Sequence, residues 1–320
     1  MIECREVTKV YRSRMLMNDY PIVVENLVKY YEGRCILDGI SLRVPRGCIY
    51  GLLGRNGSGK TTIIRILLGL EPPTRGRTVV LGQDSMRLSA QTHGRIGYVA
   101  EGHHLIQSYR VRRLVSLCRG LSLHWNEEFF GRLMETFRLP LDRKVKDLST
   151  GMRAQLNLAL AMAIDPELLI LDDPTLGLDT IARRQFLELA IDVIQRQGRT
   201  ILFSSHILGD VERIADRIGV LVAGKLVVDC TLEELKGRIK KLRVIFPDQA
   251  PEDLYVTEIV NQQKQGREMV LTVANWNRQK QAILETFHPE SCTEVPMTLE
   301  DIFIECTRPA SAVVPQEMVG

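Results

Sequence analysis

The sequence reads Gly54-Arg55-Asn56-Gly57-Ser58-Gly59-Lys60-Thr61 near its first quarter, which fits the phosphate-binding pattern G-x-x-x-x-G-K-[ST]. The glycines permit a tight turn in which successive backbone amides point at a phosphate group. The apolar run at 48–53 predicts a buried strand before this loop, and residues 61–70 predict a buried helix after it, whose positive dipole end attracts anions. These features favour a nucleoside triphosphate site over an ordinary glycine turn or a dinucleotide-binding loop.

Four side chains are expected to act on the phosphates and on magnesium. Lys60 can reach the β- and γ-phosphates, and the Thr61 hydroxyl can ligate Mg²⁺. Asp172 ends the apolar run at 168–171, where a phosphate-loop protein presents its magnesium-orienting carboxylate. Asp173 is placed to polarise a water molecule that attacks the γ-phosphate. Paired aspartates after a strand also form turns, but the phosphate loop upstream favours the functional interpretation.

The remaining pattern predicts an α/β fold. The runs at 168–171, 200–204 and 218–222 are apolar throughout, which is typical of central parallel strands covered on both faces by helices. Between 101 and 163, leucines in charged, helix-favouring surroundings predict an inserted helical subdomain. Residues 231–234 have the T-x-x-E form of a helix-capping box. We expect an N-terminal extension at 1–21, a nucleotide-binding domain at 22–230 and a small α+β accessory region at 231–320.

Composition narrows the classes of partner. Of 320 residues 45% are hydrophobic, and the net charge of +3 gives no reason to expect nucleic acid as a partner. The basic run at 236–243 is interrupted by Ile239 and Leu242, which predicts an element with one buried and one wet face. No stretch approaches the ~20 apolar residues that span a bilayer, and the N-terminal segment lacks the apolar block of a secretory signal. Seven scattered cysteines without a C-x-x-C pair indicate free thiols in a reducing compartment, so we expect a soluble cytosolic chain.

A specific family resemblance comes from LSTGM at 148–152, which resembles the LSGGQ signature of the nucleotide-binding subunits of ABC transporters. It lies about twenty residues before Asp172, a short spacing typical of that family. The resemblance covers residues 22–229 and implies a phosphate-loop NTPase core of ABC ATPase type. Three further segments match in order: a Q-loop at 96–101, a D-loop at 176–179 and a switch-histidine segment at 204–206.

The resemblance implies a role for each matching residue. Tyr31 would stack on adenine, His206 would hydrogen-bond the γ-phosphate and the attacking water, and Glu101 would link the site to a permease. Two subunits would pair head to tail around two ATP molecules, with Asp179 in the D-loop. The implied ATP-binding residues are Tyr31, Gly54, Arg55, Asn56, Gly57, Ser58, Gly59, Lys60, Thr61 and Thr62, with Thr61 and Asp172 on Mg²⁺. The residues implied to act in trans are Ser149, Thr150, Gly151 and Met152.

Three positions depart from the family pattern. Asp173 stands where the family usually has glutamate, and Glu101 and Met152 stand where it has glutamine. The form LSxGM, the paired aspartates and the LEDIF segment at 299–303 resemble bacterial exporters whose permease is a separate chain, which implies a location at the cytoplasmic face of the membrane. A catalytically degenerate partner in a heterodimer is the alternative. A soluble ABC ATPase of translation or DNA repair fits less well, because those chains usually carry two such domains, a coiled-coil insertion or zinc cysteines.

Overall fold

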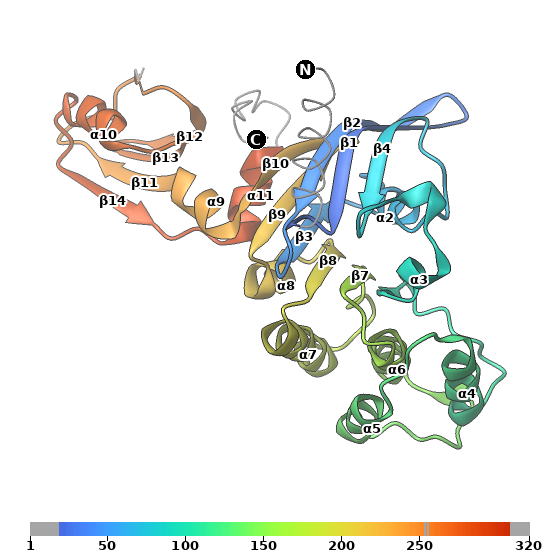
Figure 1. Cartoon of the computed structure of the whole chain (residues 1–320). Coiled ribbons are helices and arrows are strands. Elements are labelled where there is room, and N and C mark those ends of the chain that lie inside the picture. The colour runs from blue at the N-terminus through green and yellow to red at the C-terminus, as the bar shows by residue number, and fades with distance from the viewer. Residues whose placement is uncertain (1–18, 253, 255, 308–320) are drawn as a thin grey trace, which may run out of the picture. The chain divides into compact units, whose positions relative to one another are not determined.

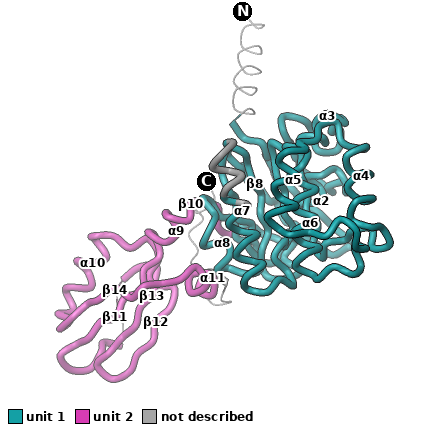
Figure 2. Tube along the Cα trace, turned by 90° about the horizontal axis from the view of Figure 1, so that it is seen from below, with its two compact units in different colours: residues 1–226 teal, residues 227–320 magenta. Residues whose placement is uncertain are grey.

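The computed structural model describes residues 19–252, 254 and 256–307, so nearly all of the expected N-terminal extension at 1–21 lies outside the described residues. The chain forms two compact units, one extending to Leu226 and one beginning at Val227, coloured separately in Figure 2. The boundary falls inside strand β10 (Lys225–Thr231). Each unit has its own hydrophobic core.

A six-stranded sheet forms the centre of the first unit, in the order β10-β9-β3-β8-β7-β6. The pairings of β9 with β3, β3 with β8, β8 with β7 and β7 with β6 are parallel. Strands β3, β7 and β8 are buried along their whole length, as their uninterrupted apolar runs predict. The strands are β3 (Ile49–Gly54), β6 (Ile96–Val99), β7 (Leu168–Asp172), β8 (Thr200–Ser205) and β9 (Arg217–Val222).

A second sheet of the first unit is antiparallel and has the order β2-β1-β4-β5. Helix α2 (Lys60–Leu67) follows the phosphate loop and buries Ile63, Ile64, Ile66 and Leu67 in one hydrophobic cluster with side chains of both sheets. The phosphate loop is therefore anchored to the centre of the core. The strands are β1 (Ile22–Tyr31), β2 (Arg34–Val44), β4 (Arg75–Val80) and β5 (Gln83–Asp84).

Helices dominate the segment between β6 and β7. Helices α4 (Val111–Leu121), α5 (Glu127–Thr136) and α6 (Thr150–Ala163) lie together in Figure 1, where we expected a helical subdomain. The other helices of the first unit are η1 (Ser85–Arg87), α3 (Ala90–His93), η2 (Val145–Asp147), α7 (Thr180–Gln197) and α8 (Leu208–Ile214). The expected α/β fold is confirmed. Within the described residues, no helix is both long and apolar enough to cross a bilayer.

The second unit is an antiparallel sheet, β12-β13-β11-β14, with helices. Thr231 and Glu234 form the predicted capping box at the start of α9 (Leu232–Arg238). The basic run at 236–243 is divided between α9 and strand β11, and Ile239 and Leu242 are both buried while Arg243 is exposed. The elements are β11 (Ile239–Ile245), β12 (Ile259–Gln265), β13 (Glu268–Ala274), α10 (Arg278–Glu285), β14 (Ser291–Val295) and α11 (Leu299–Thr307).

Candidate functional site

The parallel sheet brings three distant segments of the chain to one edge. The phosphate loop follows β3, Asp172 and Asp173 come at the end of β7, and His206 follows β8. Because adjacent parallel strands end at the same edge of a sheet, these three segments must converge there. The register places Asp172 directly opposite Ser204. The candidate site is therefore a consequence of strand order.

The phosphate loop closes around Lys60, the first residue of α2. This side chain is buried, and its Nζ donates a hydrogen bond to the Gly54 carbonyl at 2.8 Å, across the loop. Gly59 has φ of +110°, and a Cβ there would lie 2.5 Å from Leu37 Cδ2, so the position requires glycine. Burial lowers the pKa of Lys60, while the nearby Asp173, Asp172 and Glu101 carboxylates oppose that shift. The loop thus presents a cation among acidic side chains.

A cavity of about 390 Å³ lies over this loop. It brings together side chains from the loop, from β1 and from the ends of β6 and β7, and a second cavity of about 260 Å³ shares Thr61 and Glu101 with it. Gly54, Arg55 and Ser58 are not in the lining of the first cavity. Its lining residues are Tyr31, Ile36, Asn56, Gly57, Gly59, Lys60, Thr61, Thr62, Glu101 and Asp173.

Asp172 has the environment of a cation ligand. The residue is only 1% exposed, and its Oδ1 accepts a hydrogen bond from Ser204 Oγ at 2.7 Å. Its Oδ2 is buried without a hydrogen-bond partner among the described residues. Burial raises the pKa of Asp172, and hydrogen bonds from Ser204 and Thr61 act against that rise. A buried carboxylate oxygen beside a threonine hydroxyl fits Mg²⁺, which prefers hard oxygen ligands.

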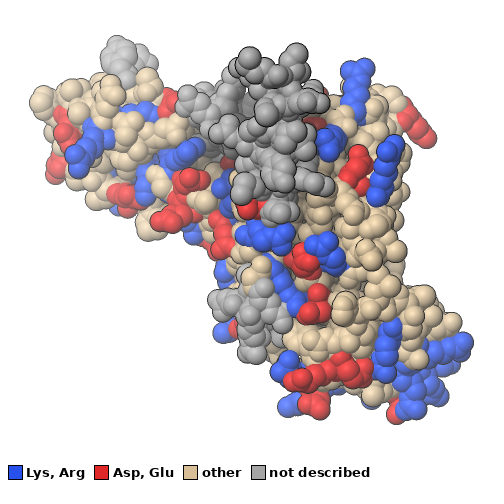
Figure 3. Space-filling view, viewed as in Figure 1, with Lys and Arg blue, Asp and Glu red and all other residues tan. Residues whose placement is uncertain are grey.

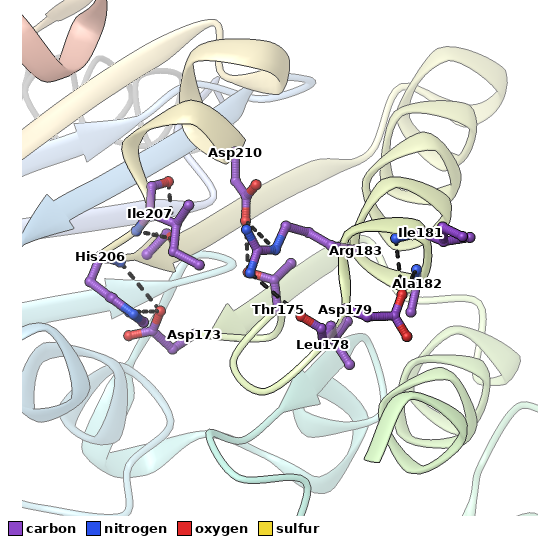
Figure 4. A network of polar contacts seen from close by, with 11 residues as sticks. Asp173, Thr175, Leu178, Asp179, Ile181, Ala182, Arg183, His206, Ile207 and Asp210 are labelled. Carbon is purple, nitrogen blue, oxygen red and sulfur yellow. Dashed lines mark hydrogen bonds and ion pairs between the residues drawn. The ribbon is translucent and has the colours of Figure 1, made fainter. Parts of the chain in front are cut away.

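Asp173 and His206 form a hydrogen-bonded pair, drawn in Figure 4. Asp173 Oδ1 lies 2.7 Å from His206 Nδ1 and accepts a second, longer bond of 3.3 Å from the His206 backbone N–H. Because a carboxylate only accepts, the short contact places the proton on Nδ1. The Asp173 backbone has φ of +44°, in the left-handed region that aspartate tolerates better than most residues. This backbone geometry aims the carboxylate at the histidine.

Comparison with known proteins identifies the family. A family model described as ABC transporter matches residues 37–176. The chain is 30% identical to the ABC transporter ATP-binding protein YtrB of Bacillus subtilis, over 88% of this chain and 97% of YtrB. It is 33% identical to the Nod factor export ATP-binding protein I of Neorhizobium galegae, over 89% of this chain and 84% of that protein. The chain belongs to the ABC transporter ATP-binding proteins.

The family accounts for the fold as well as the sequence. A solved ATP-binding subunit of an ABC transporter has a TM-score of 0.61 and 27% identity, covering 68% of this chain and 92% of that one. The resemblance noted from LSTGM is therefore confirmed, and the protein is an ATP-binding subunit of a transporter. Because the family is one of ATPases, it is an ATP hydrolase by class. The roles of its individual site residues stay predictions.

In this ABC transporter ATP-binding protein, Asp179 of the D-loop and the signature residues Ser149 to Met152 are absent from the lining of both cavities, whereas Leu176, the first D-loop residue, lines the second. Ser149 caps α6, its Oγ accepting from the Met152 N–H at 3.2 Å, while Thr150 and Gly151 form the first turn. Asp179 accepts from the backbone N–H groups of Ile181 and Ala182, both at 2.9 Å, and so caps α7. Within one subunit, these residues therefore have local structural roles.

Sequence reasoning missed Ser204 as a member of the ABC ATP-binding site. Its Oγ donates to Asp172 Oδ1 and accepts from the Asp173 N–H at 3.0 Å, so one hydroxyl holds both aspartates. Ser204 ends an apolar run and begins the switch-histidine segment at 204–206, but its contact with the two aspartates follows only from the β7–β8 register. The sequence also carries no sign of Lys29 and Glu71, because their positions beside Tyr31 follow from the fold and not from a motif.

Proposed function

We propose that this protein hydrolyses ATP in a closed dimer and thereby powers export through a separately encoded permease at the cytoplasmic face of the membrane. The observation that carries the proposal is the convergence at one sheet edge of Lys60, the buried Asp172 and the Asp173–His206 pair. One relative is named for Nod factor export, which supports export over import. The transported substrate is a property of the permease.

The phosphates of ATP bind over the loop, with Lys60 between the β- and γ-phosphates and Tyr31 against the adenine. Thr61 and Asp172 would hold Mg²⁺, and Ser204 fixes the orientation of the Asp172 carboxylate. When bound there, the ion would supply positive charge against the phosphates of ATP. Glu101 lies beside both Lys60 and Thr61 and shares both cavities, so it connects the phosphate site to the neighbouring surface.

Asp173 acts on the water that attacks the γ-phosphate. Both contacts with His206 use Oδ1, so Oδ2 is the oxygen that accepts a hydrogen bond from the water. With its proton on Nδ1 and directed at Asp173, His206 offers Nε2 as an acceptor to the attacking water. This pairing supports a working hydrolase over the degenerate alternative, since the shorter aspartate already reaches its histidine.

A partner surface is consistent with the exposed side chains of the helical subdomain. Leu121, which is 77% exposed, and Leu117 lie one turn apart on α4, and exposed leucines grouped in this way mark interaction surfaces. Basic side chains gather over the same part of the molecule in Figure 3. We assign this surface to the permease, and the signature residues Ser149 to Met152 to the ATP bound by a second ATP-binding subunit.

Steady-state ATP hydrolysis, measured over a wide range of protein concentration with Lys60→Ala as the blank, tests this function. A rate that rises faster than linearly with concentration is expected, because two chains must meet to complete each site. A rate no greater than the blank, with ATP binding demonstrated, would instead support the degenerate partner. Linear dependence at all concentrations would contradict the dimer.

The Asp173→Glu variant separates the two interpretations. If Asp173 is competent, the longer side chain is expected to change turnover by less than about 10-fold in either direction. A displacement near 1 Å can cost about 100-fold, so a degenerate site would gain about 100-fold when the family's glutamate is restored. The measurement is kcat at saturating ATP, with Asp216→Glu as a control, since Asp216 accepts from the Ile49 N–H outside the cavity lining.

A further inference from the structure

Lys29 is a buried lysine that none of the roles above explains. It lies two residues before Tyr31 on β1 and is only 8% exposed. Its Nζ lies 3.0 Å from Glu71 Oε1, donates to the Pro72 carbonyl at 2.7 Å and sits 4.8 Å from the centroid of the Tyr31 ring. Burying an ammonium group is unfavourable unless such partners compensate. The three contacts fix the charge against the aromatic ring.

Glu71, which lies far from Lys29 in the sequence, is the second charged residue in contact with this cluster around Tyr31. Its carboxylate pairs with the Lys29 ammonium group at 3.0 Å, and the Tyr31 hydroxyl lies close enough to lower the pKa of Glu71. Burial acts to raise the pKa of Glu71, but the hydrogen bonds from Tyr31 and Lys29 hold it below its ordinary value. Burial, followed by the bond to Glu71, raises the pKa of Tyr31.

The position of this cluster relates it to the nucleotide cavity. Tyr31 lines the cavity, whereas Lys29 and Glu71 do not, so Lys29 contacts a cavity-lining side chain without lining the cavity itself. Glu71 and Pro72 follow shortly after the end of α2, the helix that starts at Lys60. Lys29 and Glu71 therefore connect the Tyr31 ring to the segment that follows the C-terminal end of α2. The first residue of α2, Lys60, is the one proposed to bind the phosphates.

We propose that Lys29 is a positioning residue for the base of the nucleotide. It holds the Tyr31 ring by a cation–π contact on one face and leaves the other face for adenine, while the phosphate loop acts independently. This inference rests on the proposed function, because it requires that ATP occupies the cavity. The consequence is selective. Replacing Lys29 weakens the part of the binding free energy that comes from adenosine and leaves the part that comes from the triphosphate unchanged.

The experiment compares two ligands by isothermal titration calorimetry of the full chain: MgATP and magnesium tripolyphosphate, which lacks the nucleoside. For Lys29→Met we expect on the order of 5-fold weaker MgATP binding and a change of less than about 2-fold for tripolyphosphate. Lys29→Arg should restore MgATP affinity, since guanidinium also stacks on aromatic rings. Lys225→Met is the matched control: Lys225 pairs with Asp38 at 3.3 Å, and its side chain is 66% exposed.

The two ligands distinguish the possible failures. Equal weakening of MgATP and tripolyphosphate by Lys29→Met, or unchanged binding of both, overturns the role of Lys29 and leaves the proposed function intact. If wild-type protein binds neither ligand, the proposed function itself fails. If Lys29→Met does not fold, Glu71→Gln decides instead, because it removes the charged anchor of Lys29 and should reproduce the selective loss of MgATP affinity.

Discussion

Replacing Lys60 by alanine is expected to weaken MgATP binding at least about 30-fold and to abolish hydrolysis. The side chain is buried, donates across the loop to the Gly54 carbonyl and is surrounded by the carboxylates of Asp172, Asp173 and Glu101. Without its charge, the phosphates of ATP would face those acidic groups alone. Truncating one partner of a buried charge pair costs about 2–5 kcal/mol, which corresponds to roughly 30-fold or more in affinity.

Calorimetry with MgATP measures this effect directly. Lys225→Ala provides the control, because it removes an exposed lysine of the same unit whose ion pair with Asp38 lies outside the cavity lining. The melting temperature of each variant without nucleotide shows whether the phosphate loop remains folded. Affinity within threefold of wild type in a folded Lys60→Ala protein would remove the basis for assigning this cavity to ATP.

The sequence predicts the fold well where local chemistry is decisive. The glycine pattern predicts a loop followed by a helix, the apolar runs predict the buried strands β7 and β8, and the capping box predicts the start of α9 at Thr231; each is confirmed. The sequence pattern does not show that the basic run at 236–243 is divided between two elements: α9 ends at Arg238 and a strand begins at Ile239. A boundary of that kind depends on strand pairing with β13 and β14.

The site was predicted less completely because its supporting residues are remote in sequence. Ser204 holds Asp172 and Asp173 across 32 and 31 residues, and Lys29 meets Pro72 across 43. A sequence motif identifies side chains that contact a ligand. Ser204 and Lys29 instead contact the motif residues or their neighbours, and strand register and helix length determine which partners they meet. The signature and D-loop show the converse: their motifs are evident, but within one subunit Ser149 and Asp179 only cap helices.

Asp173→Asn is expected to lower kcat by about 10²- to 10⁴-fold while MgATP affinity stays equal or becomes tighter. The amide has the size of the carboxylate but lacks its charge, so it polarises the attacking water poorly, and general-base contributions are of this magnitude. Removing one negative charge from beside the γ-phosphate also reduces repulsion. A split between unchanged binding and lost turnover identifies an interaction needed in the transition state.

Asp210→Asn is the matched control for this variant. Asp210 is also buried and belongs to the same region of Figure 4, but its carboxylate accepts from Thr175 Oγ1 at 2.8 Å, lies 3.8 Å from Arg183 Nε and is absent from the cavity lining. We expect turnover within about threefold of wild type, because the asparagine oxygen can still accept the bond from Thr175 and the lost ion pair with Arg183 lies outside the cavity lining. Equal losses in both variants would mean that buried charge at this sheet edge matters in general. In that case Asp173 would have no special relation to the attacking water, and His206, its hydrogen-bond partner, would become the candidate base.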